Sequence, residues 1–69
     1  MEKTMTETER KKWSYQIATV LRTKPMYLYI ERVEQVSESE KNVFVTYKGN
    51  KIGALMRRDE VIRTWRVIA

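Results

Sequence analysis

The chain of 69 residues contains no cysteine and no histidine, and it has only two glycines and one proline. Without cysteine there is no disulfide, and without both residue types the usual zinc, iron–sulfur and haem ligand sets are missing. The Ser-His and Cys-His pairs of common nucleophilic enzymes are excluded for the same reason. These absences predict a non-catalytic protein without metal or cofactor, and they fit a reducing compartment.

Long apolar runs are also missing. No apolar stretch approaches the roughly 20 residues that span a bilayer. The first residues are polar and carry acids early, so they lack the basic-then-apolar order of a secretory signal. We therefore expect a cytoplasmic protein that has no membrane partner.

The small size limits the core that the chain can build. A chain of this length forms one domain at most, and its core contributes only a few kcal/mol net. Burial has to come from the two tryptophans, the four tyrosines, Phe44 and the aliphatic residues, or from a second copy of the chain. The sequence leaves a monomer and a homo-oligomer open. We predict a single domain over residues 1–69, frayed over residues 1–5, where no apolar period is present.

Positive charge exceeds negative charge, with 14 Lys/Arg against 9 Asp/Glu and a net charge of +5. Residues 25–40 are acidic, because they carry Arg32 against four glutamates. Residues 41–69 are basic, because they carry seven Lys/Arg against Asp59 and Glu60. A basic surface attracts polyanions through its long-range field and through counterion release, so nucleic acid is the first partner class to consider. A solvated basic surface without a partner is the alternative.

Residues 7–23 are predicted to form a helix. Thr6 lies three residues before Glu9, which is the spacing of a capping box. Pro25 disfavours helical geometry at Lys24 and ends the helix there. One apolar stripe at helical spacing is formed by Trp13, Ile17, Val20 and Leu21.

Residues 26–36 are predicted to form a long strand, because the apolar period changes to two after Pro25. A change of phase near Arg32 indicates a bend or bulge. The aliphatic side, expected to pack on the helix, holds Met26, Leu28 and Ile30. Tyr27 and Tyr29 lie on the other side, where tyrosines spaced by two either stack on bases or anchor a protein interface, or else belong to a closed core.

Residues 43–56 predict a hairpin with strands 43–48 and 51–56 and a central Gly49-Asn50 pair. Gly53 indicates a bulge or a close backbone approach within the second strand. Residues 61–68 fit both a helix and a strand, and we favour a strand because almost all of them are β-formers. A helical turn over Arg58-Asp59-Glu60 is expected before it.

The predicted fold is therefore α+β, with one N-terminal helix packed on a small, strongly bent antiparallel sheet of about four strands. This order of elements resembles that of Sm-like and other SH3-like small barrels. The glycine and aspartate signatures of the Sm family are missing, so the resemblance covers element order only and transfers no residue role.

Basic and aromatic residues of the β-rich part form the candidate binding site. Four arginines fall within ten positions around Trp65, and arginine binds phosphate with a planar fork and stacks on bases. The candidate nucleic-acid-binding residues are Lys48, Lys51, Arg57, Arg58, Arg63, Arg66, Tyr27 and Tyr29. The competing interpretation pairs the arginines across neighbouring strands with Glu31, Glu34, Asp59 and Glu60.

The predicted function is that of a small regulatory or nucleic-acid-binding protein, which contacts DNA or RNA mainly through phosphates. The alternative is a protein-interaction module, such as a small inhibitor, adaptor or assembly factor, that docks on an acidic protein partner. A continuous basic surface favours the first function, and an exposed apolar patch favours the second.

Overall fold

A computed structural model describes residues 6–68 of the chain. One α-helix, one short 3-10 helix and four strands follow one another along it. Their bounds are α1 Glu7–Leu21, η1 Pro25–Tyr27, β1 Leu28–Gln35, β2 Glu40–Tyr47, β3 Asn50–Arg57 and β4 Glu60–Arg66. The predicted α+β class is confirmed, whereas the prediction for residues 1–5 lies outside the described residues. Between residues 6 and 68, no helix has the length and apolar character needed to cross a membrane.

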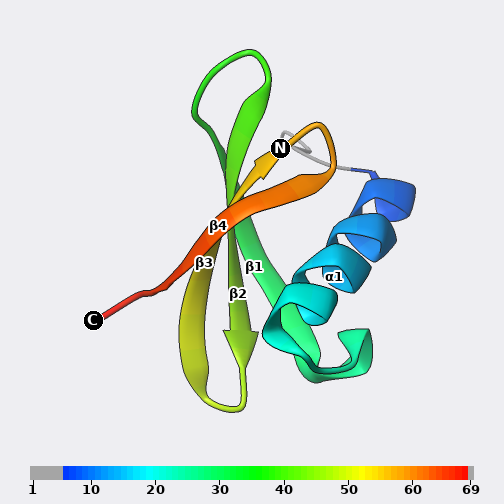
Figure 1. The fold of residues 1–69 in the computed structure, drawn as a ribbon, viewed down its shortest axis with the longest axis vertical. Helices are drawn as coiled ribbons and strands as arrows, with labels where there is room; N and C mark the ends of the chain where they lie inside the picture. The colour runs from blue at the N-terminus through cyan, green and yellow to red at the C-terminus, as the bar shows by residue number, and fades with distance from the viewer. Residues whose placement is uncertain (1–5, 69) are drawn as a thin grey trace.

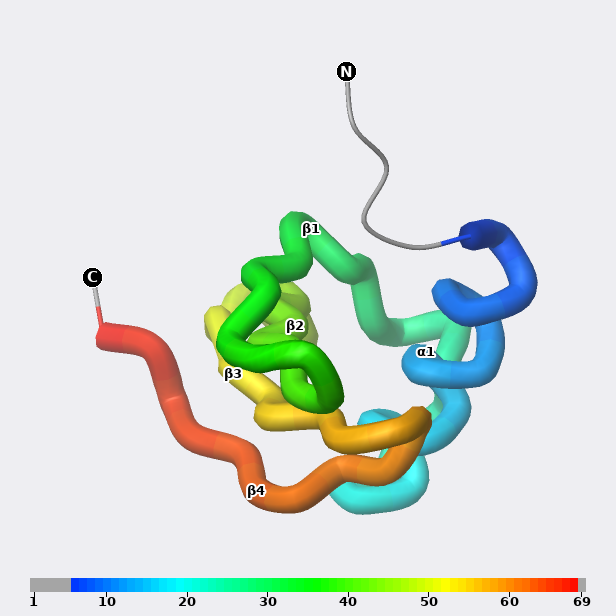
Figure 2. The backbone as a smooth tube through the Cα atoms, turned by 90° about the horizontal axis from the view of Figure 1, so that it is seen from above, coloured from blue at the N-terminus to red at the C-terminus, as the bar shows by residue number. Residues whose placement is uncertain are grey.

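The four strands form one antiparallel sheet in the order β1-β2-β3-β4, so each strand pairs with its neighbours in sequence. The sheet is strongly bent, and α1 lies in its concave side, where it packs against both edge strands (Figures 1 and 2). Within the described residues β1 and β4 do not pair with each other, so the sheet stays open. The closed barrel of the Sm-like and SH3-like layout is therefore not confirmed.

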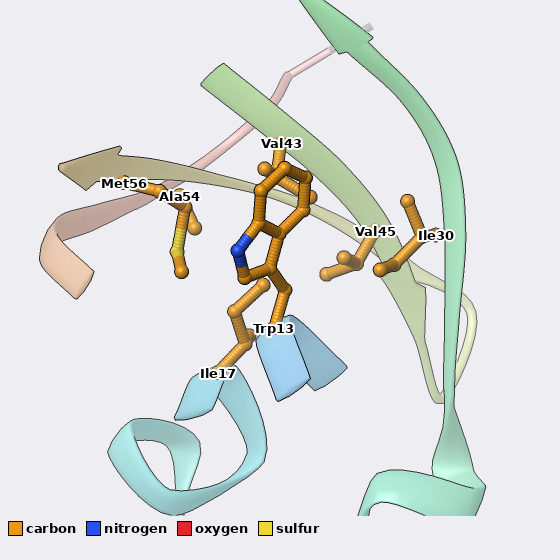
Figure 3. Close-up of a cluster of buried hydrophobic side chains, with 7 residues drawn as sticks. All are labelled: Trp13, Ile17, Ile30, Val43, Val45, Ala54 and Met56. Carbon is orange, nitrogen blue, oxygen red and sulfur yellow. The ribbon is translucent and has the colours of Figure 1, made fainter. Parts of the chain in front are cut away.

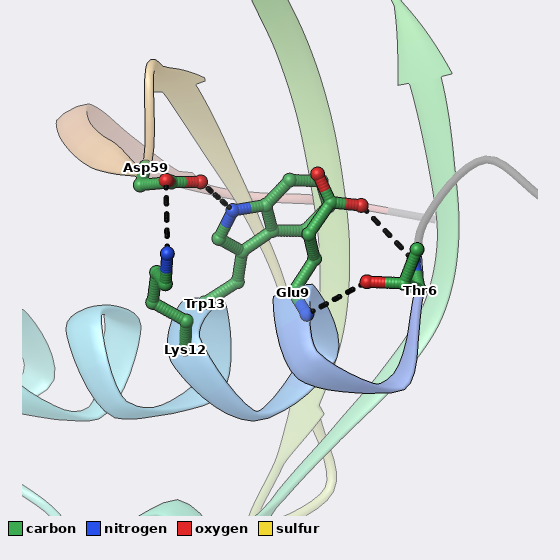
Figure 4. Close-up of polar contacts among 5 residues, drawn as sticks. All are labelled: Thr6, Glu9, Lys12, Trp13 and Asp59. Carbon is green, nitrogen blue, oxygen red and sulfur yellow. Dashed lines mark hydrogen bonds and ion pairs between the residues drawn. The ribbon is translucent and has the colours of Figure 1, made fainter.

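The helix α1 begins at the predicted capping box. The Thr6 hydroxyl accepts a hydrogen bond from the Glu9 backbone N–H at 3.1 Å, and the Glu9 carboxylate accepts one from the Thr6 backbone N–H at 3.0 Å (Figure 4). The helix ends at Leu21, two residues earlier than predicted. Arg22 ends it by adopting a left-handed conformation with φ 59°, from which its N–H bonds back to the last turn.

The core lies between α1 and the concave face of the sheet (Figure 3). Its buried residues are Trp13, Ile17, Ala18, Ile30, Val43, Val45, Ala54 and Met56. Of the predicted helix stripe, Trp13 and Ile17 are buried and Leu21 packs against the core, but Val20 is 49% exposed. The buried stripe centres on Ile17 and Leu21, which leaves Val20 at its edge and brings Ala18 inside.

The strand β1 begins at Leu28, later than predicted, because Pro25–Tyr27 form a 3-10 turn closed by a hydrogen bond from the Tyr27 N–H to the Lys24 carbonyl. The prediction that Met26 belongs to the core is wrong, since it lies in this turn and is 76% exposed. Leu28 packs against the core as expected.

The bulge predicted near Arg32 is confirmed. The register between β1 and β2 shifts between Ile30 and Arg32, which makes Glu31 the extra residue. Ile30 is buried in the core, and Arg32 lies on the opposite face of the sheet, paired in register with Phe44. We call the face of the sheet that points away from α1 the outer face.

The hairpin between β2 and β3 is confirmed, but its turn is not the predicted Gly49-Asn50 pair. Tyr47 pairs with Asn50, so the two turn residues are Lys48 and Gly49, with φ 49° and 78°. Positive φ at both positions matches the right-handed twist of the strands, which explains why the hairpin is tight.

The last segment is the strand β4, as favoured from the sequence. The helical turn expected over residues 58–60 is wrong, because Arg58 and Asp59 form a second two-residue hairpin turn with φ 50° and 70°. The close approach predicted at Gly53 is confirmed: a Cβ at Gly53 would lie 2.3 Å from Cζ2 of Trp65, across the neighbouring strand.

Candidate nucleic-acid interface

The eight predicted site residues do not form one surface. The register of the strands places four of them on the outer face, namely Tyr29, Lys51, Arg57 and Arg63. Arg66 lies on the other face of β4, and Arg58 lies in the β3–β4 turn. Lys48 lies in the β2–β3 turn at the opposite end of β3, and Tyr27 lies in the 3-10 turn. Strand geometry therefore separates residues that are close in sequence.

Ion pairs neutralise part of the outer face. The Arg57 guanidinium lies 2.6 Å from the Glu40 carboxylate, and the Lys51 ammonium lies 3.6 Å from Glu31. The hydrogen bond from Arg57, helped by its charge and by Ser37, holds the pKa of Glu40 below its ordinary value against partial desolvation. Arg57 is thus paired across neighbouring strands, as the competing interpretation predicts, but with Glu40, which that interpretation did not name. None of the four arginines forms an ion pair with Glu31, Glu34, Asp59 or Glu60 within the described residues.

Most carboxylates gather at one end of the molecule, formed by the first turn of α1, the β1–β2 connection and the β3–β4 turn (Figure 1). The described carboxylates at this end are Glu7, Glu9, Glu34, Glu38, Glu40, Asp59 and Glu60. Cations are interspersed among them: Arg10 lies 3.6 Å from Glu7, and Lys12 lies 3.4 Å from Asp59 (Figure 4). This end therefore has little net field of one sign.

At the other end Glu31 accepts a hydrogen bond from Thr46 and pairs with Lys51. Four further cations there are Arg22, Lys24, Lys48 and Arg66, and we call these four residues the basic pole. Leu21 at the end of α1, Tyr47 before the β2–β3 turn and Arg66 at the end of β4 line one groove, which brings the three elements together. All four cationic side chains are exposed. None of them forms an ion pair with a carboxylate in the described part of the chain.

Tyr47 lies beside two cations of the basic pole, since it precedes Lys48 and lines the same groove as Arg66. The Lys48 ammonium lies 5.4 Å from its ring centroid. A hydrogen bond from Thr23, followed by the hydrogen bond and the charge of Lys48, holds the pKa of the Tyr47 phenol below its ordinary value despite partial desolvation.

Two cations of the basic pole occupy positions that favour glycine. Arg22 and Lys48 have φ 59° and 49°, a conformation that costs a residue with a side chain about 1 kcal/mol. Residues kept in such conformations occur preferentially at functional sites. Arg58 also has a left-handed conformation, with φ 50°, and forms no ion pair in the described residues, although it lies at the other end of the molecule. Backbone strain at an unpaired cation therefore does not by itself distinguish the basic pole.

Sequence reasoning identified Lys48 and Arg66 but not the other two cations of the basic pole. Arg22 and Lys24 follow the end of α1. They lie near Lys48 only because of the way α1 packs across the sheet. One pattern could have indicated the pole, because residues 10–30 and 41–58 contain no Asp or Glu. Segments without acids that meet in space produce a surface of one sign.

Comparison of the chain with protein-family models, with curated proteins and with solved structures finds no match. The functional inference therefore starts from the charges, contacts and exposure of residues 6–68. The main feature of this surface is the concentration of unpaired cations at the basic pole.

Proposed function

We propose that the protein is a small, non-catalytic nucleic-acid-binding protein of the cytoplasm, with a regulatory role, that holds DNA or RNA mainly through phosphate contacts at the basic pole. One observation carries the proposal: Arg22, Lys24, Lys48 and Arg66 are exposed at the same end and have no carboxylate partner there. Uncompensated cations attract a phosphate chain and gain binding free energy by releasing its condensed counterions.

The number of cations sets the expected strength of the salt effect. Four phosphate contacts give a slope of about −3 to −4 in a plot of log affinity against log salt concentration. A fourfold rise in salt then weakens binding on the order of 100-fold. Phosphate contacts carry no base identity, so we expect weak sequence selectivity.

The test is a titration of labelled single-stranded and double-stranded oligonucleotides at two salt concentrations. The test variant combines Lys24→Glu with Arg66→Glu. The matched control combines Lys11→Glu with Arg58→Glu, which changes the net charge equally at exposed cations that also have no ion pair but lie outside the basic pole. We expect the first variant to lose binding and the second to keep most of it.

Two results would overturn the proposal. Absence of any binding at low salt would exclude nucleic acid as the ligand, and equal losses in both variants would mean that net charge acts without a site. An acidic protein surface is the alternative ligand for the same cations. Capture of a protein partner that survives nuclease treatment, together with absent oligonucleotide binding, would favour that alternative.

A further inference from the structure

The outer face of the sheet carries an aromatic cluster that α1 does not cover. The rings of Phe44 and Trp65 meet edge to face, with centroids 6.1 Å apart and an angle of 89° between their planes. The guanidinium carbon of Arg32 lies 4.2 Å from the Phe44 centroid, and that of Arg63 lies 4.9 Å from the Trp65 centroid. Two rings and two guanidinium groups from β1, β2 and β4 thus form one continuous cluster.

Tyr29 lies between this cluster and the basic pole, and Tyr27 lies in the turn that follows Lys24 of the pole. Tyr29 is 64% exposed on the outer face, where it pairs in register with Thr46, two residues from Phe44 along β2. Tyr27 is 55% exposed in the 3-10 turn that follows Lys24. Neither side chain makes a hydrogen bond or ring contact within residues 6–68. Their rings therefore contribute little to the core.

The charges of the two surfaces differ. On the outer face, three cations have carboxylate partners, in the pairs Arg32–Glu34, Lys51–Glu31 and Arg57–Glu40, and Arg63 has none in the described residues. At the basic pole, the cations have no such partner within the described residues. A phosphate is therefore attracted to the pole, whereas the outer face offers a nearly neutral surface of rings and guanidinium groups, which suits the faces of bases.

We infer that the ligand of the basic pole is single-stranded nucleic acid, whose unpaired bases stack on Tyr29 and on the neighbouring cluster of Phe44 and Trp65. This inference rests on the proposed function. Bases in a duplex stack on one another and hide their faces, whereas bases in a single strand stack on aromatic and guanidinium planes. Phosphates at the pole and bases along the outer face then belong to one strand that passes Tyr29.

Three probes of equal length separate phosphate contacts from base contacts. They are an oligothymidylate of about 16 nucleotides, a duplex of the same length, and a single strand of abasic sites with the same phosphates. We expect the full-length protein to bind the oligothymidylate about 10-fold or more tighter than the abasic strand or the duplex. All three probes should lose affinity in the Lys24→Glu/Arg66→Glu variant.

Substitutions at Tyr29 test the base contacts separately from the phosphate contacts. Tyr29→Ala should weaken binding of the oligothymidylate about 5- to 100-fold and leave binding of the abasic strand unchanged. Tyr29→Phe keeps the ring and should keep the affinity. The matched control is Tyr15→Ala, which removes a ring that is 62% exposed on α1 and should leave all three affinities unchanged.

The failures of the two proposals are distinct. If the duplex or the abasic strand binds as tightly as the oligothymidylate, or if Tyr29→Ala has no effect, base stacking is excluded while phosphate binding at the basic pole stands. If none of the probes binds at low salt, the proposed function itself is excluded.

Discussion

The indole N–H of Trp13 donates a hydrogen bond of 2.7 Å to the carboxylate of Asp59, 46 positions further along the chain (Figure 4). Trp13 is 3% exposed, so its N–H depends on a protein acceptor. Asp59 supplies this acceptor from the β3–β4 turn, where it has φ 70°. The contact thus joins the buried face of α1 to the hairpin that carries β4.

Asp59→Ala should lower the free energy of unfolding by about 2–3 kcal/mol, because it leaves a buried N–H without an acceptor and places alanine in a left-handed conformation. Asp59→Asn keeps an acceptor oxygen and tolerates that conformation, so it should cost less than about 1 kcal/mol. Urea denaturation of both variants measures the difference. Equal losses would show that the charge of Asp59, and not its hydrogen bond to Trp13, stabilises the turn.

The charge of Asp59 predicts a pH dependence. The hydrogen bond from Trp13, together with the hydrogen bond and charge of Lys12 and the charge of Lys41, lowers the pKa of Asp59 against partial desolvation. A pKa that is lower in the folded state means that the unfolded state binds protons first as the pH falls. The contribution is therefore fully present above the unfolded-state pKa, near 3.8, and is lost as the pH falls through the folded-state value.

This dependence is measured as the difference in unfolding free energy between the parent protein and Asp59→Asn across acidic pH. The parent should be the more stable protein at pH 5 to 7, by a constant difference that shrinks below about pH 4. Asp59 is partly exposed, so the difference should be small and should shrink further in high salt. A difference that grows on acidification would contradict the assignment.

The approach of Trp65 to Gly53 predicts a second stability effect. In Gly53→Ala the new Cβ would lie 2.3 Å from Cζ2 of Trp65, so the indole has to move, at a cost of about 1–3 kcal/mol. In a Trp65→Leu background this cost should fall below about 1 kcal/mol. Thermal unfolding of the four proteins in this cycle measures the coupling.

Gly49→Ala is the control for this cycle. Gly49 has φ 78°, and no atom lies within 4 Å of the place that a Cβ would take, so its substitution should cost about 1 kcal/mol through backbone strain alone. That cost should be the same with Trp65 or with leucine at position 65. A Gly53→Ala cost that is likewise independent of position 65 would mean that the indole does not limit the space at Gly53.

Local patterns predicted the elements whose causes are local. Thr6 and Glu9 form the capping box within one helical turn, and the change of phase along β1 predicted the bulge near Arg32, which the structure places at Glu31. The turn at Arg58-Asp59 was missed because it contains no glycine, so its left-handed conformation is not evident from residue type. The hydrogen bond from Trp13 to Asp59 joins this turn to α1, which is distant in sequence. Closure of the sheet likewise depends on pairing between its two edge strands, which no local pattern determines.

The candidate site shows the same division. Lys48 and Arg66 were found as charged residues of the β-rich segment, but Arg22 joins them only because Leu21 and Tyr47 line the same groove. Arg63 and Arg66 are three positions apart and were treated as one cluster, although the pleat and register of β4 place them on opposite faces of the sheet. Proximity in sequence was therefore a poor guide to which cations act together.

The strained cations of the basic pole predict opposite effects on stability and binding. Arg22→Gly and Lys48→Gly relieve a left-handed conformation and should each raise the free energy of unfolding by about 0.5–1 kcal/mol. Each also removes a cation from the pole and should weaken oligonucleotide binding. Arg58→Gly, at φ 50° outside the pole, should give the same gain in stability with little change in affinity. Equal effects of all three on affinity would argue against a localised site.

The slope of log affinity against log salt concentration measures the number of phosphate contacts at the basic pole. Single substitutions show which residues make these contacts. Lys24→Gln removes an unpaired cation of the pole and should reduce the slope of log affinity against log salt by about one unit. Arg57→Gln removes the same charge from a cation that is already paired with Glu40 at 2.6 Å, so its slope should stay at the parent value. Both affinities are measured by oligonucleotide titration over a range of salt concentrations. A slope that falls equally in both variants would mean that the phosphate chain contacts the outer face as closely as it contacts the pole, and the separation of charge between the two surfaces would then not direct binding.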